Sequence, residues 1–181
     1  MHSPSIEYFL INELNFSISK RQKAEIWINN EKISPEQLIR ILKQAKDKSF
    51  VYLLCFFDTF SRKNTNYFIN KKDYFIQLSS KETNESNKRS LTNIFITMLK
   101  FHYNSFSNHQ KERITEICFN WLIDDSLIAT QCNCLTCLDI LTKENKWIKD
   151  ELMHIIDKNF THKPPSYQSR AKKIMKKYRS I

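Results

Sequence analysis

The sequence predicts an all-α fold, and three observations carry this prediction. Apolar residues recur at steps of three and four along most of the chain, which is the period of one helical face. The segments "SPEQ" at 34–37 and "SNHQ" at 107–110 have capping-box spacing, in which serine and glutamine satisfy each other's backbone amides at a helix start. Prolines stand only where such segments begin, and none interrupts one. Helix is therefore the only regular structure that we expect.

About ten helices of roughly 10 to 18 residues are expected. In the front half, Leu38, Ile41 and Leu42 follow the first capping box on one face. The run "FVYLLCFF" at 50–57 is apolar on nearly all sides, so its helix should be central and covered by neighbours. The expected helices span residues 4–14, 18–29, 35–46, 49–62, 66–78, 88–103, 108–122, 126–142, 146–159 and 166–179.

The back half repeats the helical spacing. Ile94 and Met98 share one face, and Ile114 and Ile117 follow the second capping box in the same way. Glycine, the usual residue at a helix end, is absent from the chain, and asparagine is the next best residue for a left-handed conformation. We therefore expect asparagine to end helices at Asn30, Asn64, Asn104 and Asn145.

The helix lengths and spacing also predict an arrangement. Short helices paired at a spacing of roughly 30 to 45 residues favour an α-α superhelix of stacked antiparallel hairpins, of the HEAT or armadillo kind. Residues 1–181 should form a single helical-repeat domain. The stretch "SSKETNESNKR" is the one long polar connection, at about 79–89, and the best candidate for a mobile loop.

Composition excludes several enzyme classes. The chain of 181 residues contains no glycine, which Gly-rich phosphate loops, dinucleotide-binding turns and nucleophile elbows all need. The N-terminus lacks a signal-peptide pattern, and the longest apolar run is less than half of the roughly 20 residues of a membrane span. We expect a cytoplasmic protein with no membrane partner, whose five cysteines are reduced. No catalytic residue and no cofactor-binding residue can be assigned.

Cys132, Cys134 and Cys137 lie within six residues and raise the question of a metal site. On one helix, Cys134 and Cys137 point about 60° apart, whereas Cys132 points about 140° away from Cys137. Structural zinc sites usually draw four ligands from paired turns or loops, and no second Cys or His pair has suitable spacing. The preferred interpretation is that these cysteines fill the core as small apolar residues, with no metal and no cofactor.

Two other groups of residues could act as acids or bases, but each has a simpler structural interpretation. Asp124 and Asp125 form a carboxylate pair, but aspartate at a helix start more simply serves as a cap. His154 follows Trp147 by seven residues, on nearly the same helical face, and could act as a base beside an aromatic wall. A partly buried packing histidine is the preferred interpretation.

Positive charge is concentrated near the C-terminus. The chain carries a formal net charge of +10, and from Lys143 onward it has eleven Lys and Arg against four acids. Within "SYQSRAKKIMKKYRSI" the residues Tyr167, Ala171, Ile174, Met175 and Tyr178 form one apolar stripe, so the helix should dock and display a cationic face. A solvated face is the preferred interpretation; the functional alternative is anion or partner contact by Arg170, Lys172, Lys173, Lys176, Lys177 and Arg179.

The stretches "ERITEICFNWLIDDSLIA", "KWIKDELMHIIDKNF" and "SYQSRAKKIMKKY" resemble a family of short all-helical bacterial proteins of the HEAT or armadillo type, often labelled adenylosuccinate lyase. The resemblance covers most of the chain, is sharpest from Glu112 to Tyr178, and implies the fold. Adenylosuccinate lyases of the fumarase superfamily carry a mobile catalytic loop that reads Gly-Ser-Ser-x-Met-Pro-x-Lys-x-Asn-Pro. A chain without glycine lacks this loop, so the label implies no catalytic residue here.

Three functional hypotheses follow. The first is a noncatalytic helical-repeat scaffold that binds a protein partner, since stacked hairpins expose a concave surface. The second is a nucleic-acid-binding HEAT-like module that uses the basic C-terminal helix. The third, a lyase, rests on the family label alone.

Overall fold

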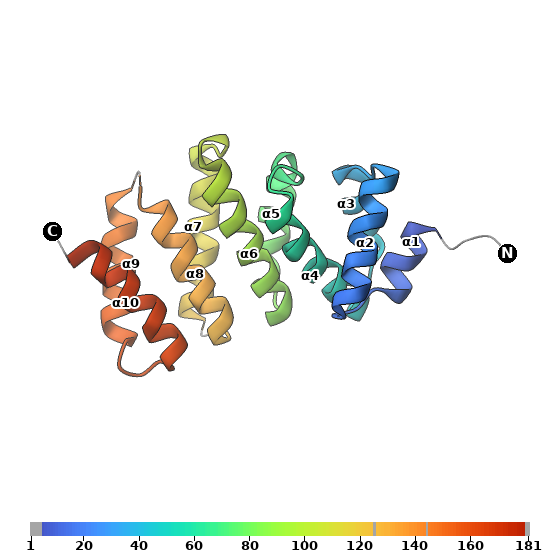
Figure 1. Ribbon diagram of the computed structural model, residues 1–181. Coiled ribbons are helices and arrows are strands. Elements are labelled where there is room, and N and C mark those ends of the chain that lie inside the picture. Colours follow the sequence, from blue (N-terminus) through green and yellow to red (C-terminus); the bar gives the residue numbers. More distant parts are fainter. Residues whose placement is uncertain (1–4, 125, 144, 180–181) are drawn as a thin grey trace. The chain divides into compact units, whose positions relative to one another are not determined.

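The all-α prediction is confirmed. The computed structural model describes residues 5–124, 126–143 and 145–179, and within them the chain forms ten α-helices and no strand. Figure 1 shows helices that follow one another and are joined by short connections. None of the described helices is long and apolar enough to cross a membrane. The chain divides into two compact units, Met1–Lys72 and Asp73–Ile181.

The first unit begins with a short α-helix that widens into a π-helical turn. In this turn the amide of Leu14 donates to the carbonyl of Phe9 at 2.9 Å. The helix expected at 4–14 is therefore only partly α-helical, and its expected first residue, Pro4, lies outside the described residues. The elements of this unit are α1 (Ile6–Tyr8), the π turn η1 (Phe9–Glu13), α2 (Ile18–Glu31), α3 (Pro35–Gln44), α4 (Asp47–Lys63) and the 3₁₀ turn η2 (Ile69–Lys71).

Helix α3 starts as its sequence predicts. The amide of Gln37 donates to the Ser34 hydroxyl at 3.2 Å, and the amide of Ser34 donates to the Gln37 side chain at 2.8 Å. Pro35 occupies the first helical turn, where its missing N–H costs nothing. Leu38, together with the other apolar residues on its face, is buried. The predicted capping box is confirmed.

An aromatic cluster on α4 forms the centre of the first unit. Phe56, Phe57 and Phe60 are each at most 1% exposed. The ring of Phe57 lies 4.8 Å from that of Phe68, a favourable distance for tilted aromatic rings. Tyr52, on another side of α4, is only half-buried, so this helix is covered less completely than its apolar sequence predicts.

Lysine, not asparagine, takes the left-handed position at the end of α2. Lys32 has φ 51° and ψ 42°, and the next amide, of Ile33, donates to the carbonyl of Ile28 at 3.0 Å. Asp47 is the other described residue with positive φ. The expectation that asparagine ends helices in this conformation is therefore wrong: Asn64 ends α4 at φ −118°, and Asn145 precedes α9 in an extended conformation.

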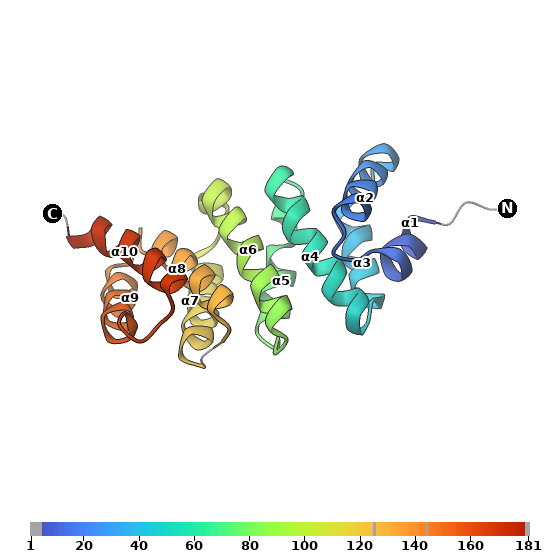
Figure 2. The same ribbon diagram turned by 60° about the horizontal axis from the view of Figure 1, so that its bottom comes forward.

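Helix α8 lies at the centre of the second unit and contacts α6, α7, α9 and α10. Both ribbon views show α8 beside α7 (Figures 1 and 2). The elements are α5 (Lys72–Ser79, whose first residue closes the first unit), α6 (Glu85–His102), the 3₁₀ turn η3 (Tyr103–Ser105), α7 (Asn108–Ile123), α8 (Ile128–Leu141), α9 (Lys146–Asn159) and α10 (Pro165–Arg179).

The polar connection expected at about 79–89 is shorter than predicted. Helix α5 continues to Ser79 and α6 already begins at Glu85, because the side chain of Asn84 accepts hydrogen bonds from the amides of Ser86 and Asn87. Asparagine is one of the strongest N-capping residues, so the polar sequence here starts a helix. Only residues 80–84 connect the two helices.

The start of α8 is stabilised by another helix. The carboxylate of Glu85, in the first turn of α6, accepts from the amide of Leu127 at 2.9 Å and from the hydroxyl of Thr130 at 3.3 Å. Asp124, expected to cap this helix, instead ends α7, and Asp125 lies outside the described residues. The capping interpretation of Asp124 is therefore wrong.

Candidate functional site

The six basic residues predicted for partner contact are all exposed on α10. The apolar stripe of this helix is buried at Tyr167, Ala171 and Ile174, as expected. The opposite side displays the cationic residues to solvent, so the docking half of the prediction is confirmed. The exposed set is Arg170, Lys172, Lys173, Lys176, Lys177 and Arg179.

Part of this cationic face is already neutralised within the chain. The ammonium group of Lys177 lies 2.8 Å from the carboxylate of Asp139, and Arg179 forms an ion pair with Asp157. Partial burial would lower the pKa of Lys177, but hydrogen bonds to Asp139 and Tyr178 outweigh it and raise that pKa above its ordinary value. Lys177 and Arg179 are therefore engaged by acids of α8 and α9.

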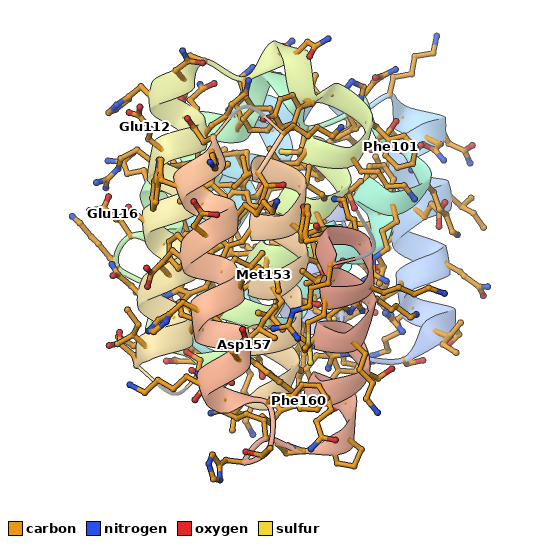
Figure 3. The ribbon with its side chains drawn as sticks, turned by 90° about the vertical axis from the view of Figure 1, so that its left-hand side faces the viewer. Phe101, Glu112, Glu116, Met153, Asp157 and Phe160 are labelled. Atoms are coloured by element: carbon orange, nitrogen blue, oxygen red, sulfur yellow. The ribbon has the colours of Figure 1, made fainter. Side chains whose placement is uncertain are left out.

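Two other cations of α10 have neutral neighbours. Arg170 donates to the hydroxyl of Thr136 at 2.8 Å, and the ammonium group of Lys172 lies 5.8 Å from the centre of the Phe160 ring. Figure 3 shows Phe160 near the end of α9, close to α10. Because neither contact cancels charge, these two side chains can still attract an anion or an acidic partner.

The cysteines fill the core as predicted, except for Cys132. Cys134 and Cys137 are fully buried, whereas Cys132 is half-buried beside α10. Cys118, on α7, joins Cys134 and Cys137, which both hydrogen-bond to its sulfur. The sequence spacing could not predict this contact, because Cys118 belongs to another helix. All five cysteines are free thiols.

Cys134 and Cys137 are buried hydrogen-bond donors to Cys118, not exposed nucleophiles. Burial raises the pKa of Cys134 and of Cys137 well above the usual value for a thiol. The sulfur of Cys137 also lies 3.6 Å from the carbonyl oxygen of Thr92, as expected for a weak S–H donor. Across the described ranges no three Cys, His, Asp or Glu side chains are arranged to hold a metal ion.

A groove of about 450 Å³ lies on the outer face of α7, where α9 begins. We call it the α7–α9 groove; it is lined by Glu112, Arg113, Glu116, Phe119 and Trp147, together with polar neighbours on α7. The α7 residues recur at three- and four-residue steps, so they share one face of that helix. Figure 3 shows Glu112 and Glu116 on the same outer side of α7.

Trp147 gives the α7–α9 groove an aromatic wall. Its ring centre lies 5.8 Å from that of Phe119, and the two planes are tilted by 31°. Phe119 is 9% exposed, whereas Trp147 is 55% exposed. The tryptophan therefore has one side packed and a large apolar area left in contact with water.

The charges of the α7–α9 groove are two carboxylates and one guanidinium. Arg113 forms an ion pair with Glu116 at 2.8 Å and also donates to the Ser80 hydroxyl at 3.2 Å. Both partners of this pair are about half exposed, with relative side-chain areas of 41% and 58%. Such surface pairs contribute little to stability, so Glu116 can exchange partners at low cost.

A second groove, of about 440 Å³, lies on the exposed face of α2 in the first unit. Ile26 and Trp27 are its apolar residues, and Ile26 is 60% exposed. The ammonium group of Lys23 lies 5.9 Å from the Trp27 ring centre and 4.8 Å from that of Phe9. This groove is already covered in part by a lysine of its own helix.

Sequence reasoning paired Trp147 with His154 and missed the α7–α9 groove. His154 is exposed, so the packing interpretation of this histidine is wrong. The aromatic neighbour of Trp147 is Phe119, which lies on a different helix. One signal was present: Glu112 and Glu116 stand four residues apart on the helix that ends in "FNWLI".

Comparisons with protein-family models, with curated proteins and with solved structures find no match for this chain.

Proposed function

We propose that the protein is a noncatalytic helical-repeat scaffold, of the HEAT or armadillo kind, that binds a protein partner in the cytoplasm. The helices of the described residues are short and follow one another through short connections, which supports a stack of helical hairpins. The lyase hypothesis has no comparable support, because the chain has no glycine for the signature loop of that enzyme class.

The observation that carries this proposal is the exposure of Trp147. A tryptophan left 55% exposed beside a packed aromatic ring, at the edge of a groove of about 450 Å³, has the character of a binding hot spot. Tryptophan is enriched at the centres of protein interfaces, where burying its large apolar area stabilises the complex. We therefore assign the α7–α9 groove as the docking surface.

A capture experiment tests this function. The protein is immobilised and exposed to a nuclease-treated native lysate, with Trp147→Ala as the test variant. Phe101→Ala is the matched control, because Phe101 is also 55% exposed but lies on α6, away from Glu112 and Glu116 in Figure 3. We expect wild type and Phe101→Ala to retain the same discrete proteins and Trp147→Ala to lose them. Equal retention by all three would contradict the assignment.

Nucleic-acid binding is the second candidate function, and one observation favours it. Arg170, Lys172 and Lys173 stand exposed on one helix, and the first two have neutral neighbours that leave their charge uncancelled. A cationic cluster of this kind can contact phosphates without regard to sequence. If the immobilised protein retains partners from untreated lysate but not from nuclease-treated lysate, nucleic-acid binding is favoured over the protein scaffold.

A further inference from the structure

We propose that the α7–α9 groove recognises a lysine or arginine side chain of the partner, seated on Trp147 beside the carboxylates of Glu112 and Glu116. This inference rests on the proposed docking function and names the chemistry of what docks. It commits to a basic peptide segment as the occupant. Three independent features of the groove support this choice.

The first feature is the open ring of Trp147. The other two tryptophans each have a lysine of the same chain over the ring: Lys23 lies 5.9 Å from the Trp27 centre, and Lys88 lies 5.8 Å from the Trp121 centre. Among the residues that the structure describes, no lysine or arginine takes this position over Trp147. Tryptophan is the best aromatic partner for a cation. Trp147 is therefore available to a cation from another molecule.

The second feature is the pair of carboxylates. Glu112 and Glu116 are one helical turn apart, both exposed, and both line the groove with Trp147. Their charge is opposite in sign to the formal net charge of the chain, +10, which repels a basic segment. Charge complementarity of this kind selects the partner and orients it.

The third feature is the packing behind the ring. Phe119 is buried and packs against the Trp147 ring at a tilt of 31°, so one side of that ring is supported before a ligand arrives. Preorganised contacts of this kind improve binding because less conformational entropy is lost. Arg113 contacts Glu116 and Ser80 and does not lie over the Trp147 ring.

The test uses three blocked peptides of identical Ala and Leu framework that carry four lysines, four glutamines or four glutamates. Fluorescence anisotropy of labelled peptide measures binding to the full chain at low and physiological salt. We expect the lysine peptide to bind at least tenfold more tightly than the glutamine peptide, and the glutamate peptide to bind least. Absence of binding by the lysine peptide, or equal binding of all three, overturns the proposal.

Two substitutions at Trp147 separate the aromatic contribution from simple apolar contact. Trp147→Phe keeps a ring that can attract a cation, whereas Trp147→Leu keeps apolar area alone. We expect Trp147→Phe to retain most of the affinity for the lysine peptide and Trp147→Leu to lose about tenfold. Equal affinity of the two variants would show that the cation does not bind on the aromatic ring at position 147.

The carboxylates are tested by Glu112→Gln with Glu116→Gln, which should weaken the lysine peptide by about tenfold or more. Asp157→Asn is the control for the loss of one ion-paired acid, because Asp157 is exposed and pairs with Arg179, just as Glu116 pairs with Arg113. Thermal melts confirm that all variants fold. Unchanged affinity in the double variant overturns the proposal.

The capture experiment distinguishes failure of this inference from failure of the proposed function. If Trp147→Ala loses the captured partners but the double glutamine variant keeps them, the groove docks a protein by other chemistry. In that case the inference fails and the docking function stands. If neither change affects capture, both are wrong.

Discussion

The carboxylate of Glu85 accepts a hydrogen bond at 2.9 Å from the backbone amide of Leu127, 42 residues further along the chain. Glu85 also forms an ion pair with Lys88 at 2.8 Å, and the side chain of Lys88 is only 12% exposed. The start of α8 therefore depends on a side chain of α6. In the second unit this contact joins the two helices through backbone as well as side-chain atoms.

Removing this carboxylate should destabilise the fold. Glu85→Ala deprives the amide of Leu127 of its acceptor and the ammonium group of Lys88 of its counter-charge, and we expect a loss of about 1–2 kcal/mol in the free energy of unfolding. Urea denaturation monitored by circular dichroism measures it. Glu112→Ala, at an exposed position on α7, is the control and should change the free energy by less than about 0.5 kcal/mol.

The same residue should affect stability in acid. Partial burial would raise the pKa of Glu85, but hydrogen bonds from Lys88 and Leu127 outweigh it and lower that pKa. A lowered pKa means that the folded state holds the proton less tightly than the unfolded state. The stabilisation is therefore fully present above the ordinary glutamate pKa of about 4.3 and is lost as the pH falls through the folded value. Glu85→Gln should flatten the fall in stability between about pH 5 and pH 3, and parallel curves for wild type and variant would contradict this explanation.

The docked face of α10 should be far more sensitive than its exposed face. Ile174 is 3% exposed, so Ile174→Asp places a carboxylate in an apolar contact and should cost several kcal/mol. Lys173→Asp, at the adjacent exposed position, should leave the melting temperature within a few degrees of wild type. Thermal melts of the two variants compare the faces. A stable Ile174→Asp protein would show that α10 does not dock through this stripe.

The cationic face of α10 gives a prediction for nucleic-acid binding. Replacing Lys172, Lys173, Lys176 and Lys177 by Gln should preserve the fold, because exposed charges contribute little to stability individually. If the chain binds nucleic acid through α10, this change should weaken binding to unrelated sequences. It should also reduce the dependence on salt, by roughly one unit of slope for each phosphate that the variant no longer neutralises. Titration of DNA and RNA at two salt concentrations measures both effects.

A control with the same change in net charge separates local contact from overall charge. It replaces four exposed lysines of the first unit by Gln: Lys32, Lys43, Lys46 and Lys48. An equal loss of affinity in the control would mean that overall charge, and not α10, governs binding. A wild-type chain that binds no nucleic acid at low salt would remove the second candidate function.

Thiol reactivity should divide the cysteines into two groups. Cys55 and Cys132 are half-buried, whereas the other three are buried. A thiol reagent that forms mixed disulfides should modify two sites in the folded chain and all five after denaturation. Cys55→Ser combined with Cys132→Ser should remove the fast reaction. A fast third thiol would show that the buried group of Cys118, Cys134 and Cys137 opens in solution.

The parts of this fold that the sequence predicted correctly depend on local contacts. The capping boxes at Ser34 and Ser107 involve residues three apart, and both formed as expected. The buried stripe of α10 was equally predictable, because helical period alone determines which residues share a face. Such features can be predicted without knowing which other helix packs against them.

The parts that escaped prediction depend on which helices meet. The approach of Cys118 to Cys134, the cap that Glu85 provides to α8, and the packing of Trp147 on Phe119 all join residues from different helices. Their sequence separations carry no periodic signal. The α7–α9 groove belongs to this group, so its residues could not be assembled from one chain segment.

The left-handed conformation of Lys32 indicates which parts of the chain can tolerate a change of sequence. A side chain with a Cβ atom in that conformation costs on the order of 1 kcal/mol, which glycine would avoid. The chain tolerates this cost because burial of apolar helix faces supplies most of its stability. The turns should therefore tolerate insertions and substitutions, whether natural or engineered. The buried faces of α4 and α8 should not, because they determine the fold.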